Sequence, residues 1–168
     1  IEGSGVGLWD WRVQTGEVEF NSRWAQIVGY ALQELAPLSI DTWFKLVHPD
    51  DLEMSHQLLQ KCFNSELSVY ECEVRMRHKD GQWLWVLSRG KVVEWGKDGR
   101  PVRMSGTHLD ITERKQAEKA LRESEHTLRT IFDNTHDAIF VHAIDGRVLD
   151  VNRKMLELYR VSREQALQ

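Results

Sequence analysis

Residues 71–93 of this 168-residue chain read ECEVRMRHKDGQWLWVLSRGKVV, and this stretch decides the fold. Apolar and charged side chains alternate strictly over 68–78, which is typical of a strand with one buried and one solvated face. The Lys-Asp-Gly sequence at 79–81 is a turn signal, so 82–94 is predicted to return as a second strand. Another Gly-rich turn leads into a third strand over 102–111. The sequence therefore predicts an antiparallel meander that needs only hairpin connections.

The segments before the meander predict a hairpin and several helices. Residues 5–20 alternate on both sides of Gly16 and indicate two further strands. Over 21–35 the apolar spacing becomes helical, but Gly29 interrupts it and favours short helices. Pro49 stands at the first position of a longer helix, where the acidic residues that follow complement the helix dipole.

The segment after the meander predicts a long helix. Residues 112–133 contain neither Gly nor Pro and are rich in strong helix formers. Leu121, Leu128 and Ile131 belong to a partly apolar heptad seam that runs for less than three heptads. This length is too short to predict a coiled coil on its own.

An internal repeat explains a length that exceeds one ordinary domain. A shift of 131 residues places residues 18–21 (VEFN) on 149–152 (LDVN) and Trp24 on Met155. In both copies a strand, a Gly turn, a second strand ending in Asn and an amphipathic helix follow in order. The predicted parts are a complete domain, a linker helix and the N-terminal part of a truncated second copy, over 1–111, 112–133 and 134–168.

Composition excludes several function classes. The chain has 22 Lys and Arg against 26 Asp and Glu, so no basic footprint predicts a nucleic-acid partner. No apolar run approaches the ~20 residues that span a bilayer, so we expect no membrane contact in this segment. Cys62 and Cys72 lack CxxC spacing, which fits a cytoplasmic location. No nucleophile and base pair or metal-ligand spacing stands out, so we predict neither catalysis nor a metal site.

Four motifs resemble those of the PAS sensory domain with its PAC-type C-terminal part. The resemblance covers residues 5–115, and 134–168 resembles the first part of a second PAS domain. The motifs are GLWDWRVQTGEVEFNSRW (7–24), LVHPDD (46–51), the meander stretch (71–93) and GTHLDITERKQAEKAL (106–121).

The resemblance implies an α+β fold with a five-stranded antiparallel sheet in the order 2-1-5-4-3. Helices on one face would enclose a pocket, and a long signalling helix would follow. Such modules sense or dimerise and do not catalyse. Their output is commonly a histidine kinase of a two-component system or a diguanylate cyclase, reached through the helix that begins at Asp110-Ile111-Thr112.

Two functions follow from the resemblance. The first is a cytoplasmic sensory module that receives a small-molecule, redox or partner signal. It would pass this signal through the Asp-Ile-Thr junction and the linker helix to an output domain downstream in the same protein. The alternative is a ligand-free PAS domain that serves for dimerisation and spacing. In both, we expect a homodimer formed through the sheet face and the linker helix.

The resemblance also bears on cofactors, and the sequence requires none. The flavin adduct of LOV-type PAS domains needs a Cys just before the long helix, where residues 39–51 (SIDTWFKLVHPDD) have none. This excludes the covalent adduct, while a non-covalent flavin stays open. Haem-binding PAS domains use a His of the long helix, and His56 stands there. An ordinary helix residue is the favoured interpretation of His56.

Two histidines are interpreted from their sequence context. By resemblance to the LOV branch, His108 on the last strand should face the pocket, where it could bind a ligand and respond to pH. The alternative for His108 is a satisfied core histidine. His48, with Asp50 and Asp51, offers imidazole and carboxylates, but the start of a helix accounts for them and no catalytic site is predicted.

Six further residues complete the predicted sites. Asp110 and Thr112 have side chains suited to capping the exit helix, and the resemblance implies that they transmit the signal. Four tryptophans on sheet strands are candidate dimer contacts, because large aromatic side chains dominate interfaces. These are Trp9, Trp11, Trp83 and Trp85.

Overall fold

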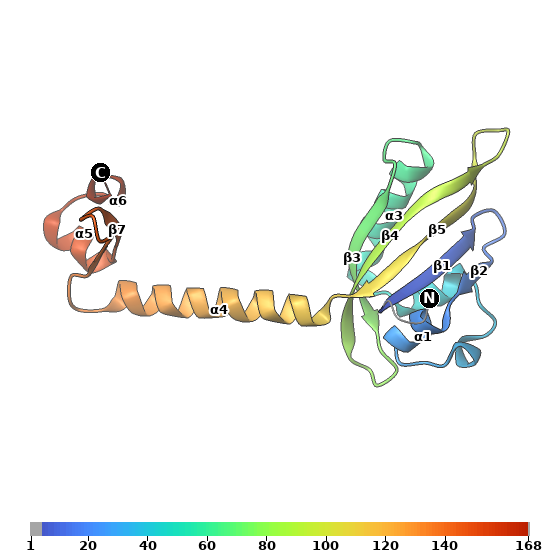
Figure 1. The fold of residues 1–168 in the computed structure, drawn as a ribbon, viewed down its shortest axis with the longest axis horizontal. Coiled ribbons are helices and arrows are strands. Elements are labelled where there is room, and N and C mark those ends of the chain that lie inside the picture. Colours follow the sequence, from blue (N-terminus) through green and yellow to red (C-terminus); the bar gives the residue numbers. More distant parts are fainter. Residues whose placement is uncertain (1–4, 168) are drawn as a thin grey trace. The chain divides into compact units, whose positions relative to one another are not determined.

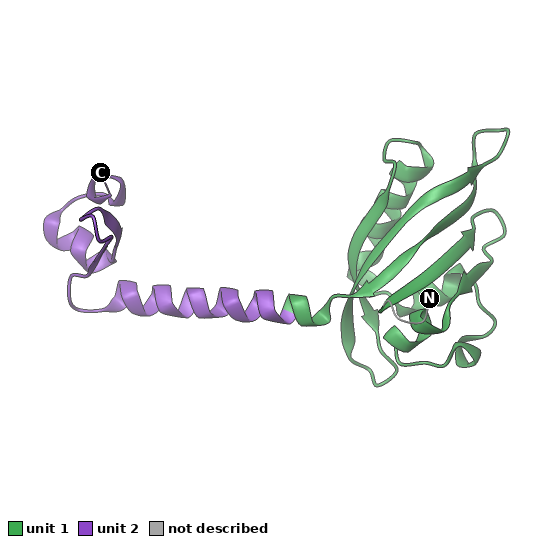
Figure 2. Cartoon of the chain, in the orientation of Figure 1, with its two compact units in different colours: residues 1–115 green, residues 116–168 purple. Residues whose placement is uncertain are grey.

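The computed structural model describes residues 5–167 of the chain. The chain forms two compact units, residues 1–115 and 116–168, which Figure 2 colours separately. Helix α4 (Thr112–Asn134) begins in the first unit and continues in the second. The long helix that the sequence predicts over 112–133 is therefore one uninterrupted element.

Five antiparallel strands form one sheet in the first unit, in the order β2-β1-β5-β4-β3 (Figure 1). This confirms the α+β fold and the strand order that the resemblance implies. Each strand of the meander begins and ends within two residues of its predicted bounds. The strands are β1 (Val6–Arg12), β2 (Val18–Phe20), β3 (Tyr70–Arg77), β4 (Trp83–Trp95) and β5 (Pro101–Asp110).

Short helices and one longer helix cover a single face of this sheet. Alternation along the strands places apolar side chains such as Val74, Val86 and Met104 on the covered face, where they are fully buried. The opposite face carries charged side chains. The covering elements are α1 (Ser22–Ile27), the 3-10 helix η1 (Leu32–Leu35), α2 (Ile40–Leu46) and α3 (Pro49–Phe63).

The His-Pro-Asp-Asp motif fastens α3 to the sheet. His48 accepts a hydrogen bond from the backbone N–H of Asp50 at 3.2 Å, and Pro49 occupies the first helical turn. Asp51 accepts from the backbone N–H of Arg75 at 2.8 Å and from its guanidinium at 2.9 and 2.6 Å. These bonds hold the pKa of Asp51 below its usual range. These bonds give the cluster a structural role at the start of α3.

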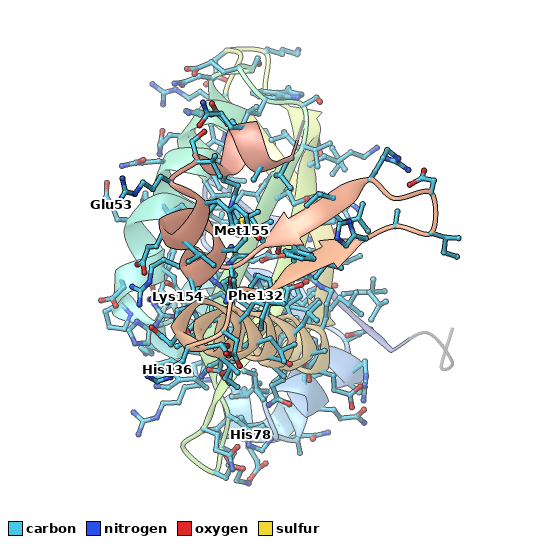
Figure 3. All side chains as sticks on the ribbon, turned by 90° about the vertical axis from the view of Figure 1, so that its left-hand side faces the viewer. Glu53, His78, Phe132, His136, Lys154 and Met155 are labelled. Atoms are coloured by element: carbon cyan, nitrogen blue, oxygen red, sulfur yellow. The ribbon has the colours of Figure 1, made fainter. Side chains whose placement is uncertain are left out.

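The second unit repeats the opening of the first. It contains a two-stranded antiparallel sheet of β6 and β7, followed by two short helices. Figure 3 shows His136 after the end of α4 and Lys154 on the first of these helices, and both line one polar pocket of this unit. The elements are β6 (Phe140–His142), β7 (Val148–Val151), α5 (Arg153–Tyr159) and α6 (Arg163–Ala166).

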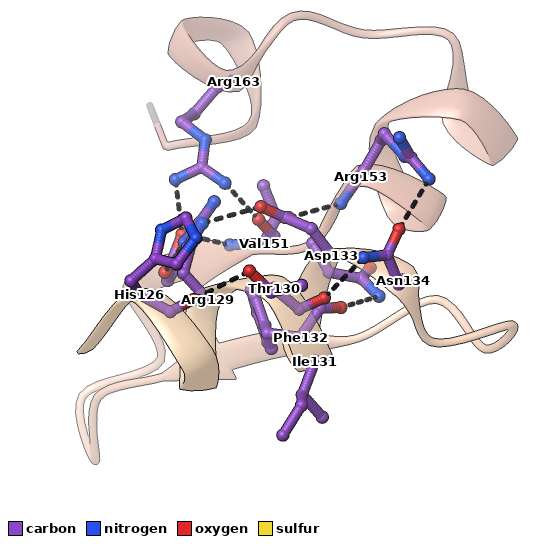
Figure 4. A network of polar contacts seen from close by, with 12 residues as sticks. His126, Arg129, Thr130, Ile131, Phe132, Asp133, Asn134, Val151, Arg153 and Arg163 are labelled. Carbon is purple, nitrogen blue, oxygen red and sulfur yellow. Dashed lines mark hydrogen bonds and ion pairs between the residues drawn. The ribbon is translucent and has the colours of Figure 1, made fainter. Parts of the chain in front are cut away.

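A polar network ties the end of α4 to β7, α5 and α6 within the second unit (Figure 4). Arg129 donates to Asp133 at 2.8 Å and to Asp150 at 2.6 Å. Asp133 also accepts from the backbone N–H of Arg153 at 3.0 Å, and Arg163 donates to Asp150 at 2.8 Å. Two carboxylates therefore organise the contacts among these elements.

Candidate functional site

Two neighbouring glycines, Gly90 and Gly106, leave room for a large side chain on the covered face of the sheet. Register places Trp9 of β1 opposite Gly106 of β5, which in turn lies opposite Gly90 of β4. A Cβ atom added at either glycine would collide with the indole of Trp9. The ring of Trp9 therefore lies across two neighbouring strands, and only glycine leaves it room there.

The next row contains His108, which is 4% exposed. His108 lies opposite Ser88 of β4, and its Nε2 is 2.8 Å from the Ser88 hydroxyl. The ring centroid of Trp43 in α2 is 4.6 Å away. Burial lowers the pKa of His108 to about 3, so the imidazole is neutral at physiological pH. In the folded chain His108 therefore gains a proton only under strongly acidic conditions, and the predicted response to pH would occur there.

A cavity of about 30 Å³ lies between these rows and the covering helices. This volume holds roughly two water molecules, since one water needs ~10–15 Å³ on this measure. His108 is part of the lining, which is the position that the family resemblance implies. The full lining is Trp9, Trp11, Val18, Phe20, Ile40, Trp43, Leu59, Tyr70, Ser88 and His108.

Three buried indole N–H groups have no hydrogen-bond partner among the described residues: those of Trp9, Trp11 and Trp24. Trp9 and Trp11 line the cavity. A buried donor without an acceptor costs about 1–3 kcal/mol. By contrast, the hydroxyl of Tyr70 lies 2.9 Å from that of Ser55, so this pair satisfies itself.

The junction from sheet to helix uses both central strands. Asp110, at the end of β5, accepts a hydrogen bond from the backbone N–H of Thr112 at 2.9 Å. The hydroxyl of Thr112 accepts from the backbone N–H of Trp85 at 3.0 Å, and the N–H of Ile111 donates to the Trp85 carbonyl at 2.9 Å. Asp110 thus caps the helix start as predicted, whereas Thr112 bonds to β4.

Glu73 of β3 adds an ionic clamp that the sequence analysis missed. Its carboxylate lies 2.5 Å from the guanidinium of Arg114 and 2.5 Å from the ammonium of Lys115. Lys115 also stands over the ring of Trp85, 5.0 Å from the centroid. The bonds from Lys115 and Arg114 hold the pKa of Glu73 below its usual range. Three strands therefore hold the first turn of α4.

His56 lies outside the cavity, which corrects its assignment as a cofactor-binding candidate. The buried side chains of α3 include Ser55 and Leu59, four residues apart on one face. His56 is one position beyond Ser55, about 100° further around the helix, and is exposed. Its ring stacks on Phe44 with centroids 5.8 Å apart.

The four tryptophans proposed as dimer contacts fall on opposite faces of the sheet. Trp9 and Trp11 face the helices and line the cavity, so their assignment to a dimer contact is corrected. Trp83 is 42% exposed on the other face, and Trp85 is half-buried beneath Lys115. Strand parity groups residues by face, but it does not say which face the helices cover.

Known proteins share this architecture. Residues 17–108 match the family described as the PAS fold, and 126–168 match a family described as a PAS domain. Sensor protein FixL of Bradyrhizobium diazoefficiens is 30% identical over 87% of this chain and 28% of its own length. The probable diguanylate cyclase DgcE of Escherichia coli is 22% identical over 99% of this chain and 15% of its own length.

A solved structure agrees with these matches. The sensory box histidine kinase/response regulator from Burkholderia thailandensis superimposes with a TM-score of 0.67. It is 35% identical, over 77% of this chain and 94% of that one. The chain spans less than a third of FixL and of the E. coli cyclase.

Sheet, covering helices, small cavity and exit helix together define a sensory, non-catalytic signal-transduction module. The chain belongs to the PAS family. Within residues 5–167, no helix has the length and apolar character needed to cross a membrane. In the same residues, no group of three or more His, Cys, Asp or Glu side chains is arranged to hold a metal ion.

Proposed function

We propose that the chain senses a small molecule in the cavity and passes the signal through β5 and the junction to α4. The output domain would lie farther along the same cytoplasmic protein and be a histidine kinase or a diguanylate cyclase. The names of the sensory box histidine kinase/response regulator from Burkholderia thailandensis and of the probable diguanylate cyclase DgcE support this class of output. One observation carries the proposal: His108 lines the cavity, and Asp110, two residues later on β5, caps α4.

The route from cavity to helix consists of hydrogen bonds between neighbouring strands. A ligand that bonds to Ser88 or His108 competes with their 2.8 Å contact and changes how β4 and β5 fit together. Both strands hold the start of α4, through Trp85 on one side and Asp110 on the other. A small strand shift therefore changes the packing of the first helical turn.

A small molecule is favoured over a thiol redox signal. Burial raises the pKa of both Cys62 and Cys72, which disfavours the reactive thiolate. Neither cysteine lines the cavity.

Hydrogen exchange at the start of α4 tests the proposed route. In the variant His108→Phe, which keeps an aromatic ring but loses the bond to Ser88, we expect amide exchange at 112–120 to change severalfold. The control is His56→Phe on the exposed side of α3, which should leave this exchange unchanged. Unchanged exchange in the folded His108→Phe variant would overturn the route.

In the intact protein, Asp110→Ala should uncouple sensing from output without unfolding the domain.

Dimerisation and spacing is the second candidate function. Leu121, Leu128 and Ile131 are all exposed on α4, at the heptad spacing expected of a dimer seam. In this function the homodimer would form through α4. Sedimentation of the chain and of a Leu128→Glu variant tests it, since a seam predicts a dimer that the charge dissociates. A monomeric parent chain at high micromolar concentration would contradict this second function.

A further inference from the structure

We infer that Arg75 and Trp85 connect helix α3 to α4, so that the helical wall of the cavity reports to the output helix by a route of its own. The inference rests on the proposed sensing function and adds a second transmitter to it. Leu59 of α3 lines the cavity together with His108 of β5. A ligand that pushes on α3 therefore needs a connection to α4 that does not run through β5.

The connection begins at Asp51, in the first turn of α3. Its side chain is 12% exposed, and its carboxylate accepts two guanidinium bonds from Arg75, at 2.9 and 2.6 Å. It also accepts from the backbone N–H of Arg75 at 2.8 Å. A bidentate pair fixes the plane of the guanidinium as well as its distance. A movement of the first turn of α3 therefore carries the Arg75 side chain with it.

Trp85 passes this movement to α4. Register places Arg75 directly opposite Trp85 on neighbouring strands, and the guanidinium carbon lies 5.7 Å from the indole centroid. The ammonium of Lys115, in the first turn of α4, lies 5.0 Å from the same ring centroid. A cation within ~6 Å of an indole is attracted to its face. One ring therefore attracts a cation that is fixed to α3 and a cation that belongs to α4.

Each of the two cations has its own carboxylate, which offsets their mutual repulsion at the ring. Asp51 pairs with Arg75, and Glu73 lies 2.5 Å from the ammonium of Lys115. None of these four side chains lines the cavity, and neither does Trp85. The connection therefore lies outside the cavity and does not use the strand contacts of the first route.

A double-mutant cycle in the full chain tests whether the start of α3 and the start of α4 are coupled through the indole. Asp51→Asn removes the charge that orients Arg75 but keeps an oxygen that can accept from the backbone N–H. We expect amide exchange at 112–116 to change at least about twofold, as for residues coupled through direct contacts. In a Trp85→Leu background the same substitution should have no further effect. Trp85→Tyr keeps an aromatic face and should restore the response.

Two controls separate this coupling from a general loss of stability. Glu53→Gln removes a charge from the same part of α3, but Glu53 makes its 2.9 Å hydrogen bond within the helix. Trp83→Leu removes an exposed indole of β4 that stacks on His48. Neither should alter exchange at the start of α4, and in the Trp83→Leu background Asp51→Asn should keep its full effect. General destabilisation would instead give additive effects in every background.

The outcomes distinguish this connection from the proposed function. Exchange at 112–116 that ignores Asp51→Asn, or that responds in full without the Trp85 ring, would overturn the connection. If Trp85→Leu fails to fold, the NMR shifts of the Lys115 side chain decide. Loss of the Asp51 charge should change these shifts, and unchanged shifts would show that the connection is wrong.

The variant His108→Phe completes the comparison. If Asp51→Asn acts through Trp85 while His108→Phe leaves exchange at 112–120 unchanged, the connection stands and the route through β5 fails. If only His108→Phe alters this exchange, the proposed function stands and the connection is wrong.

Discussion

The two copies of the repeat make the same local bonds around an asparagine. In the first copy, Asn21 Oδ1 accepts from the backbone N–H of Leu8 and of Trp24, both at 2.9 Å. These bonds join the first strand to the helix that follows the hairpin. The asparagine is therefore both a strand contact and a helix N-cap.

The second copy reproduces this arrangement 131 residues later. Asn152 Oδ1 accepts from Ile139 at 2.9 Å and from Met155 at 3.0 Å. The two copies differ in burial, since Trp9 is 9% exposed and its counterpart Phe140 is 47% exposed. The asparagine bonds require only the hairpin and the helix that follows it. Burial of the core also requires the meander strands, which in the first copy begin fifty residues after the hairpin ends.

The largest difference in stability loss between the two copies should come from removing a core side chain. Trp24 is fully buried and stacks on Phe20 at 3.8 Å, so Trp24→Ala should lower the free energy of unfolding by ~3–5 kcal/mol. Its counterpart Met155 is half-buried, and Met155→Ala should cost about 1 kcal/mol or less. Urea unfolding followed by tryptophan fluorescence measures the loss in the first unit, because all seven tryptophans lie between residues 9 and 95, and amide exchange across β6 and β7 measures the loss in the second unit. Equal losses in the two variants would contradict the difference in burial.

Acid should destabilise the first copy through His108. Its pKa is about 3 in the folded chain and ~6.5 when unfolded, so the unfolded state binds more protons between these values. The free energy of unfolding should therefore fall as pH drops, by about 2 kcal/mol from pH 6.5 to 5. His108→Gln should flatten this slope. His142→Gln, at an exposed site of the second copy, is the control and should leave the slope intact.

Replacing each asparagine should affect only its own copy. Asn21→Ala should lower the stability of the first unit by about 1–2 kcal/mol, the usual loss for an N-cap. Asn152 is fully buried and also donates to the carbonyls of Phe132 and Asp137 at 3.0 and 2.9 Å. Asn152→Ala should accelerate amide exchange across β6 and β7 and leave tryptophan-detected unfolding unchanged. A shift in that unfolding curve would show that the copies are coupled.

Short-range pattern accounts for what the sequence predicts well. Alternation of apolar and charged residues predicted the strands of the meander. The 131-residue shift that aligns VEFN with LDVN correctly placed Asn21 and Asn152 at equivalent positions. The cavity-facing position of His108 followed from the family resemblance. Each of these rests on neighbours in sequence or on a shared motif.

Long-range placement accounts for what the sequence does not predict. Glu73 and Arg114 are 41 residues apart and meet only after the sheet has formed. The unpartnered indoles of Trp9 and Trp11 depend on which face the helices cover. His56 differs from Ser55 by one helical step, which is enough to turn it from the core to solvent.

The smallest expected effect concerns the ionic clamp that joins Glu73 of the meander to the first turn of α4. Glu73→Gln removes the charge that meets Arg114 and Lys115, and for a partly exposed cluster we expect about 0.5–1 kcal/mol. Amide exchange at 112–116 should rise a few-fold, and high salt should reduce the difference because it screens the parent's ion pairs. Glu71→Gln is a matched control, since Glu71 pairs with Arg89 inside the sheet at 2.6 Å. An equal rise in both variants would mean that surface charge in general, and not the clamp, holds the start of the helix.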